Sequence, residues 1–180
     1  SCAILSGAAT VDRDDARMTV RDPSLDLAGR RPLRVVLDTR LALRPSARLF
    51  AEEGPILVLT DSTDAQRIAA LANTGAEVLR PPEGSARDLA AVLRLLASRG
   101  INEVLVEAGA RLAGSFIEAG LADEFLLYLA PHMLGHDAAP LAMLPLLDEL
   151  GDRWDFRYSD VTQVGADLRL TLVPVGREKR

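Results

Sequence analysis

Residues 103–116 have the sequence EVLVEAGARLAGSF, and the organisation of the rest of the chain can be worked out from this segment. An apolar run over 104–106 predicts a strand, which ends at the carboxylate of Glu107. The chain then turns at 108–110 and continues as a helix toward Glu118. Because open α/β sheets bind their ligands at the carboxyl ends of their strands, this order predicts that Glu107 lies at a ligand-binding edge.

The turn at Gly109 has the properties of an anion site. Glycine lets the backbone bend sharply and approach a ligand closely. The first turn of the following helix has N–H groups without helical partners, and these favour an anion such as a pyrophosphate. Many strand–turn–helix units with such a glycine bind nothing, however, and the dinucleotide fingerprint G-x-G-x-x-G is absent here. The segment alone therefore leaves ligand binding and a purely structural turn both open.

Composition limits the class of protein. The chain has 180 residues, of which 48% are hydrophobic and 4% aromatic, and this predicts one soluble domain with a sizeable core. A net charge of -5 without a basic tract argues against nucleic-acid binding. The single cysteine, Cys2, excludes a disulfide framework and a cysteine-based zinc site. No apolar run is long enough to cross a membrane, and no leader opens the chain, which predicts a cytoplasmic protein.

Strands and helices are predicted to alternate along the chain. Apolar runs predict strands over 3–7, 33–38, 55–60, 76–79 and 123–130. Asp61 or Ser62 is the expected N-cap of a helix that ends near 72, and Ser85 that of a helix stopped by Gly100. Residues 154–164 and 167–173 predict a closing hairpin turned at 165–166. The fold class is therefore α/β, with a mostly parallel central sheet and an antiparallel edge.

Three polar segments are candidates for binding. The charged segment 10–21 follows the first strand and is either a solvated loop or a ligand-facing loop in which Arg21 or Arg17 binds a phosphate. Arg40, after Thr39 at the end of the second strand, either binds the 2′-phosphate that distinguishes NADP from NAD or is merely exposed. His132 and His136 lie in a segment that Pro131 and Gly135 predict to be a loop. No third ligand is in view, so no metal site is expected.

Three stretches together carry a family resemblance: INEVLVEAGARLAGSFIEAGLADEFLLYLAPHMLG at 101–135, AILSGAATVDRDDARMTVR at 3–21, and RPLRVVLD at 31–38. They resemble the C-terminal reductase domain of the bifunctional riboflavin-biosynthesis deaminase/reductase. The match follows nearly the whole chain in order. It implies a dihydrofolate-reductase-like fold with helices on both faces of the central sheet. The implied activity is the reduction by NADPH of 5-amino-6-(5-phosphoribosylamino)uracil, a phosphorylated small molecule, to its ribityl counterpart.

The resemblance also implies a role for individual residues. Met18 and Arg21 would contact the substrate, and Glu107 would contact the substrate and be the candidate catalytic group. No metal is implied. The cofactor contacts would come from two polar residues after the first strand, one residue near the adenosine end, and the backbone of the turn and helix: Thr10, Asp14, Thr39, Gly109, Ala110, Arg111, Leu112, Ala113, Gly114 and Ser115.

The chain also departs from the family pattern. The deaminase half with its zinc-binding signature is absent, so no deamination is expected. The first strand and helix of the reductase domain are missing too, and we expect that the N-terminus is a cut. Ala16 stands where proline is common, and His132 where lysine is common. The alternatives are an inactive fragment that binds nucleotide and dimerises, or a related pyridine-nucleotide reductase of a pteridine or pyrimidine. A homodimer is the expected assembly.

Overall fold

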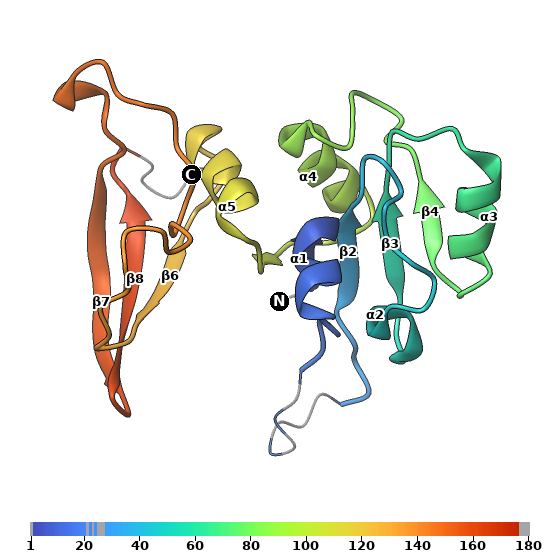
Figure 1. Ribbon diagram of the computed structural model, residues 1–180, viewed down its shortest axis with the longest axis horizontal. Coiled ribbons are helices and arrows are strands. Elements are labelled where there is room, and N and C mark those ends of the chain that lie inside the picture. The colour runs from blue at the N-terminus through green and yellow to red at the C-terminus, as the bar shows by residue number, and fades with distance from the viewer. Residues whose placement is uncertain (1, 21, 23, 25–27, 177–180) are drawn as a thin grey trace. The chain divides into compact units, whose positions relative to one another are not determined.

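The computed structural model describes residues 2–20, 22, 24 and 28–176. The chain divides into two compact units, Ser1–Leu112 and Ala113–Arg180. Helices and strands alternate through the first unit, and strands dominate the second (Figure 1). None of the helices in the described part of the chain has the length and apolar character that a bilayer crossing demands.

The first unit is built on a parallel sheet of five strands. These are β1 (Ala3–Gly7), β2 (Leu33–Leu37), β3 (Ile56–Leu59), β4 (Glu77–Leu79) and β5 (Val104–Val106), and their spatial order is β4-β3-β2-β1-β5. In the register, Gly7 lies beside Leu37, and Leu37 beside Leu59. Because every strand runs in the same direction, all the carboxyl ends lie along one edge, as the sequence predicts.

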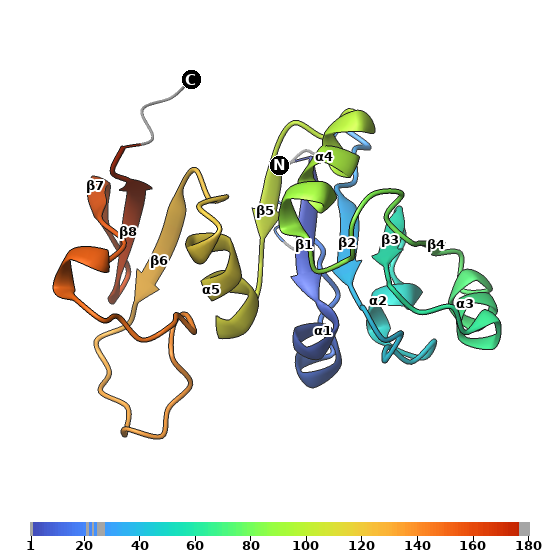
Figure 2. The ribbon, with the colours of Figure 1, turned by 90° about the horizontal axis from the view of Figure 1, so that it is seen from above.

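Helices cover both faces of this sheet, which confirms the predicted arrangement. The helices are α1 (Ala8–Asp14), α2 (Arg48–Ala51), α3 (Ala65–Ala72) and α4 (Leu89–Ser98), while α5 (Ala110–Glu118) begins in the first unit and ends in the second. Alternate strand residues point to opposite faces. Ile4, Val36 and Val58 share one core cluster with Val11 of α1, Leu49 of α2 and Leu71 of α3. Leu5, Val35 and Leu57 are fully buried on the other face, where Figure 2 shows α4.

The second unit contains an antiparallel sheet of three strands. They are β6 (Phe125–Leu129), β7 (Phe156–Val164) and β8 (Asp167–Pro174), in the order β6-β8-β7. The hairpin between β7 and β8 turns at Gly165, whose φ is 63°, as the sequence predicts. The sequence analysis predicted that these strands would form an antiparallel edge of the main sheet, and this prediction is wrong. In the described residues, β6, β7 and β8 pair only with one another.

Three local predictions also need correction. Residues 8–14 form helix α1, where a loop was expected, and Asp15 closes it in the left-handed conformation with φ 44°. Asp64, not Asp61 or Ser62, caps α3 by accepting from the backbone N–H groups of Gln66 and Arg67. Asp88, not Ser85, caps α4. The expected caps are used elsewhere, since Ser85 donates its hydroxyl to the carboxylate of Asp61 at 2.6 Å.

Candidate active site

The carboxyl edge of the parallel sheet gathers most of the predicted site residues of the first unit. Thr10 lies in α1, directly after β1, and Thr39 lies after β2. Glu107 and Gly109 follow β5, which is the neighbour of β1 on its other side. Residues that are far apart in the sequence therefore reach one edge because three adjacent strands end there together.

Thr10 and Gly109 are in direct contact. The backbone N–H of Gly109 donates to Oγ1 of Thr10 at 3.2 Å, across 99 residues of sequence. A Cβ atom added to Gly109 would lie 3.2 Å from the same oxygen, so a side chain at 109 would crowd the hydroxyl. The turn thus brings bare backbone to an exposed position beside a polar side chain. This environment fits the close approach of a phosphate group from a dinucleotide.

Helix α5 begins at Ala110, which limits how far an anion-binding turn can extend. Only the N–H groups of the first turn of a helix lack intrahelical partners. Gly114 and Ser115 lie in the second turn, so their N–H groups belong to the helix. Gly114 is also buried, and a Cβ there would collide with the backbone carbonyl of Met143. Its small size is therefore explained by packing within the second unit, and the geometry favours the segment 109–112 for phosphate binding.

Glu107 extends the pairing of β5 with β1 and then leaves the sheet. Its backbone N–H donates to the carbonyl of Leu5 at 2.9 Å, which fixes the main chain at the end of the strand. The residue is exposed, and its carboxylate has no hydrogen bond or ion pair with any residue that the structure describes. A fixed backbone with an uncommitted carboxylate suits a group that acts on a ligand.

The acidic residues of α1 and of its C-cap, Asp15, have different roles. Asp12 forms an ion pair with Arg44 at 3.1 Å. Asp15 pairs with Arg48 at 3.0 Å and also accepts from the backbone N–H of Arg48, the first residue of α2. Asp14 is exposed and has no such partner in the described part of the chain. Of the three carboxylates, Asp14 is thus the one that remains available, and its contact to the cofactor stays a prediction.

Two candidate substrate-binding residues, Met18 and Arg17, are already engaged in contacts within the protein. The side chain of Met18 is only 6% exposed and belongs to the core cluster, with φ 54°. A substrate would therefore meet the backbone of this residue more readily than its thioether. Arg17 is paired with Glu52 at 3.2 Å, which makes it a weaker candidate for a phosphate. Arg21 lies outside the described residues.

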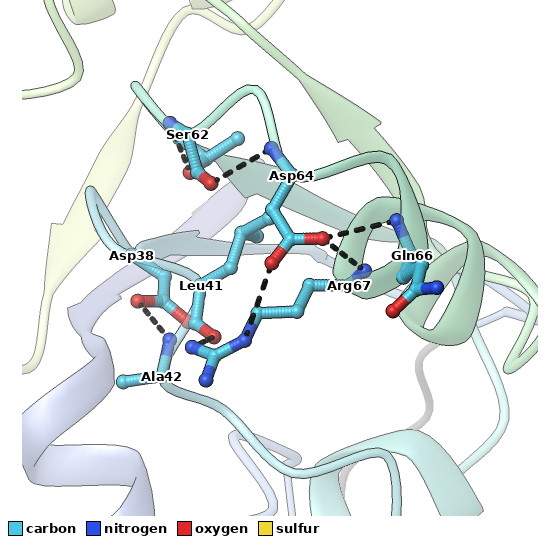
Figure 3. A network of polar contacts seen from close by, with 8 residues as sticks. Asp38, Leu41, Ala42, Ser62, Asp64, Gln66 and Arg67 are labelled. Carbon is cyan, nitrogen blue, oxygen red and sulfur yellow. Dashed lines mark hydrogen bonds and ion pairs between the residues drawn. The ribbon is translucent and has the colours of Figure 1, made fainter.

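Sequence reasoning missed the polar network that joins the ends of β2 and β3. Figure 3 shows Asp38 accepting from the N–H of Ala42, and Arg67 lying between Asp64 and the carbonyl of Leu41. Asp38 is only 3% exposed, although it follows the last residue of β2. An acidic residue immediately after an apolar strand was the one available signal. Its partners come from a turn whose shape could not be foreseen.

Arg34 is a second buried group that the sequence did not reveal. It lies in β2 and donates to the carbonyls of Leu49, Glu52 and Gly54 at 2.7 to 2.9 Å. Burial lowers the pKa of its guanidinium from the usual value. Its contacts close the C-terminal end of α2, so its role is to hold the fold.

The histidine pair lies in the irregular segment between β6 and β7. His132 and His136 are both exposed, and His136 is 3.2 Å from Asp137. Over the residues with described positions, no group of three or more His, Cys, Asp or Glu side chains could hold a metal ion.

Comparison with known proteins places these features in a family context. Residues 1–170 match the family described as RibD C-terminal domain. The riboflavin biosynthesis protein RibD of Escherichia coli is 35% identical over 182 residues, which cover 96% of this chain and 49% of the relative. The 5-amino-6-(5-phosphoribosylamino)uracil reductase of Buchnera aphidicola from Acyrthosiphon pisum is 29% identical over 97% of this chain and 87% of its own.

Solved structures give the same result. Acinetobacter baumannii RibD superposes with a TM-score of 0.83 at 31% identity, over 97% of this chain and 47% of the other. The deaminase/reductase of Thermotoga maritima superposes with a TM-score of 0.77 at 25% identity, over 96% of this chain and 45% of the other. The chain thus spans about half the length of the RibD proteins that it matches.

Proposed function

The chain belongs to the RibD C-terminal domain family, and we propose that it is an NADPH-dependent reductase of 5-amino-6-(5-phosphoribosylamino)uracil in riboflavin biosynthesis. The product is the corresponding ribitylamino compound. The observation that supports this proposal most strongly is the contact between Thr10 and Gly109, because it joins two predicted cofactor-binding segments at the edge where a parallel sheet binds ligands.

The proposed cofactor site extends along that edge. The N–H groups at the start of α5 would hold the pyrophosphate, and Thr10 would keep the turn in place. Asp14, at the end of α1, would also contact the cofactor. Thr39, at the end of β2, would contact the adenosine end. The predicted cofactor contacts also include Ala113, Gly114 and Ser115, but these residues lie further along α5. We therefore assign them a supporting role through the helix rather than direct phosphate contacts.

The chemistry requires that a sugar ring be opened and then reduced. The ribosylamine opens to an imine, which takes up a hydride at C1′ and a proton at nitrogen to give the ribityl amine. The bound cofactor supplies the hydride, and the protein supplies position and electrostatics. No protein nucleophile is needed for this reaction.

Glu107 is the candidate for the chemical step. A negative carboxylate near the imine would stabilise the positive charge that develops there, or would orient the ribose hydroxyls by accepting their hydrogen bonds. Its exposure at the end of β5, without a partner in the described chain, leaves it able to do either. Arg21 is the proposed ligand of the substrate phosphate, since Arg17 is already engaged with Glu52.

Binding and turnover measurements test this function. The chain is titrated with NADPH and, in parallel, with NADH, and nicotinamide fluorescence is followed. Turnover is then measured with 5-amino-6-(5-phosphoribosylamino)uracil. We expect saturable binding that favours NADPH and formation of the ribityl product. A folded sample that binds NADPH without turnover would instead identify a nucleotide-binding fragment. Product formed only from other pyrimidines or pteridines would identify a different reductase.

The homodimer and the cytoplasmic location remain predictions. Sedimentation of the chain tests the homodimer.

A further inference from the structure

We infer that Arg40 sets the preference for NADPH over NADH by binding the 2′-phosphate, and that buried Asp38 is the positioning residue that builds the turn presenting it. This inference rests on the proposed function, and it concerns a part of the carboxyl edge where a buried carboxylate and an exposed guanidinium are only two residues apart. The sequence left the role of Arg40 open between phosphate binding and simple exposure.

Asp38 is not available to a ribose. In many NAD-binding α/β folds, an acidic residue at the end of the second strand accepts hydrogen bonds from the ribose hydroxyls. Here both carboxylate oxygens are used internally. Oδ1 accepts from the N–H of Ala42 at 2.8 Å, and Oδ2 accepts from the N–H of Leu43 at 2.9 Å. With 3% of its surface exposed, Asp38 cannot favour NADH in this way.

The same bonds fix the turn that carries Arg40. The N–H of Leu41 donates to the carbonyl of Asp38 at 3.1 Å, and Leu41 itself has φ 52° and is 2% exposed. Its carbonyl accepts from Nη1 of Arg67 at 3.2 Å (Figure 3). Leu43 is buried as well. Residues on both sides of the exposed Arg40 are thus anchored in the core, so the position of its backbone is defined.

The neighbouring carboxylates do not compete for Arg40. Asp61 accepts from the hydroxyl of Ser85 at 2.6 Å and from the N–H of Ala86 at 2.8 Å. Asp64 caps α3 and faces Arg67. Among the residues that the structure describes, Arg40 has no hydrogen bond or ion pair of its side chain. A planar guanidinium without a partner is suited to a phosphate, which it can bind through two parallel hydrogen bonds.

The experiment compares two ligands that differ only in the 2′-phosphate. The full chain and its variants are titrated calorimetrically with 2′,5′-ADP and with 5′-AMP. The quantity compared is the ratio of the affinity for 2′,5′-ADP to the affinity for 5′-AMP. Arg40→Ala should lower the affinity for 2′,5′-ADP by roughly tenfold or more, the value of a charged hydrogen bond, and leave 5′-AMP unchanged. Arg94→Ala removes an equal charge from an exposed position on α4 and should change neither affinity.

The role of Asp38 is tested by the same ratio. Asp38→Asn keeps the size of the side chain but replaces one of the two accepting oxygens by an NH2 group. This group is a donor, so it cannot accept from the backbone N–H of Ala42 or Leu43. We expect the ratio to fall toward that of Arg40→Ala, with little effect on 5′-AMP. A folded Asp38→Asn chain with an unaltered ratio would show that Asp38 does not position Arg40. If Asp38→Asn does not fold, the Arg40→Ala ratio still tests the binding of the 2′-phosphate, because Arg40 is exposed.

Three outcomes would overturn the inference. If the unaltered chain reduces its substrate with NADPH and Arg40→Ala keeps the original ratio, Arg40 has no such role while the proposed function stands. If Arg40→Ala weakens both ligands equally, it acts on the adenosine or the 5′-phosphate, and the assignment is also wrong. An unaltered chain that binds neither ligand overturns this inference and the proposed function together.

Discussion

Gly109 and Thr10 are joined by a hydrogen bond from the backbone N–H of the glycine to Oγ1 of the threonine, 3.2 Å long. The bond connects the turn after β5 to the helix after β1. One N–H group at the start of α5 is therefore committed to the protein, and the turn is held in place before any ligand arrives. A preorganised turn of this kind loses less entropy on binding a phosphate.

Thr10→Val tests this contact directly. Valine keeps the shape of threonine but cannot accept the hydrogen bond of Gly109, so the turn loses its anchor. We expect NADPH to bind roughly two- to tenfold more weakly, which is the range for one net hydrogen bond. Thr162→Val makes the same chemical change in β7 and should leave NADPH binding as it was. An unchanged dissociation constant in Thr10→Val would show that the hydroxyl is dispensable for the cofactor.

The two glycines of the α5 segment should respond differently to alanine. Gly114→Ala puts a methyl group against the backbone of Met143, which cannot move aside easily. We expect this variant to lose about 1–3 kcal/mol of unfolding free energy, the usual cost of overpacking. Gly109→Ala is exposed and meets only the hydroxyl of Thr10, so its fold should be nearly unaffected while its affinity for NADPH falls.

Chemical denaturation and NADPH titration of both glycine variants separate these effects. The assignment of Gly114 to packing fails if Gly114→Ala unfolds at the same denaturant concentration as the unaltered chain. The assignment of Gly109 to the cofactor fails if Gly109→Ala binds NADPH with undiminished affinity.

Local patterns in the sequence were sufficient for most elements of the fold. The run at 104–106, the glycine at 109 and the helix to Glu118 are found where periodicity and turn chemistry predict them. The alternation of strands and helices also predicts that their carboxyl ends share an edge. Such signals depend on residues a few positions apart, which is why they can be recognised without the structure.

Contacts between distant segments could not be predicted in the same way. Asp12 and Asp15 look equivalent to Asp14 in the sequence, and only the positions of Arg44 and Arg48 distinguish them. The sequence placed Asp38 at the end of a strand, but it did not reveal that the N–H groups of Ala42 and Leu43 donate to its carboxylate. Whether β6, β7 and β8 extend the main sheet or form their own depends on strand pairing, which apolar runs do not specify.

The ion pair between Glu77 and Arg99 gives the first unit a pH-dependent contribution to stability. Arg99 donates two hydrogen bonds of 2.7 Å to the carboxylate, and these bonds lower the pKa of Glu77 from its usual value. A lowered folded-state pKa contributes stability above the unfolded pKa and loses it as the pH falls through the folded value. Because both side chains are partly exposed, the contribution is below about 1 kcal/mol.

Glu77→Gln should therefore be slightly less stable than the unaltered chain at neutral pH, and the difference should be smaller at pH 3, below the ordinary glutamate pKa of about 4.3. Urea unfolding at both pH values measures it. Glu83→Gln, in the exposed turn after β4, is the matched control and should show no difference at either pH. A Glu77→Gln deficit that persists in acid would mean that packing, not charge, joins β4 to the end of α4.

Glu107→Gln tests the chemical role of the carboxylate at the end of β5. Glutamine retains the size of the side chain and its hydrogen-bonding oxygen, but it cannot stabilise a positive charge on the imine. We expect kcat to fall roughly 10- to 100-fold, as for the loss of a charged interaction, while the dissociation constant of NADPH stays the same. Glu124→Gln removes a charge just before β6 and should leave kcat unaltered. If Glu107→Gln turns over normally but KM rises, the residue orients the ribose and contributes nothing to the chemical step.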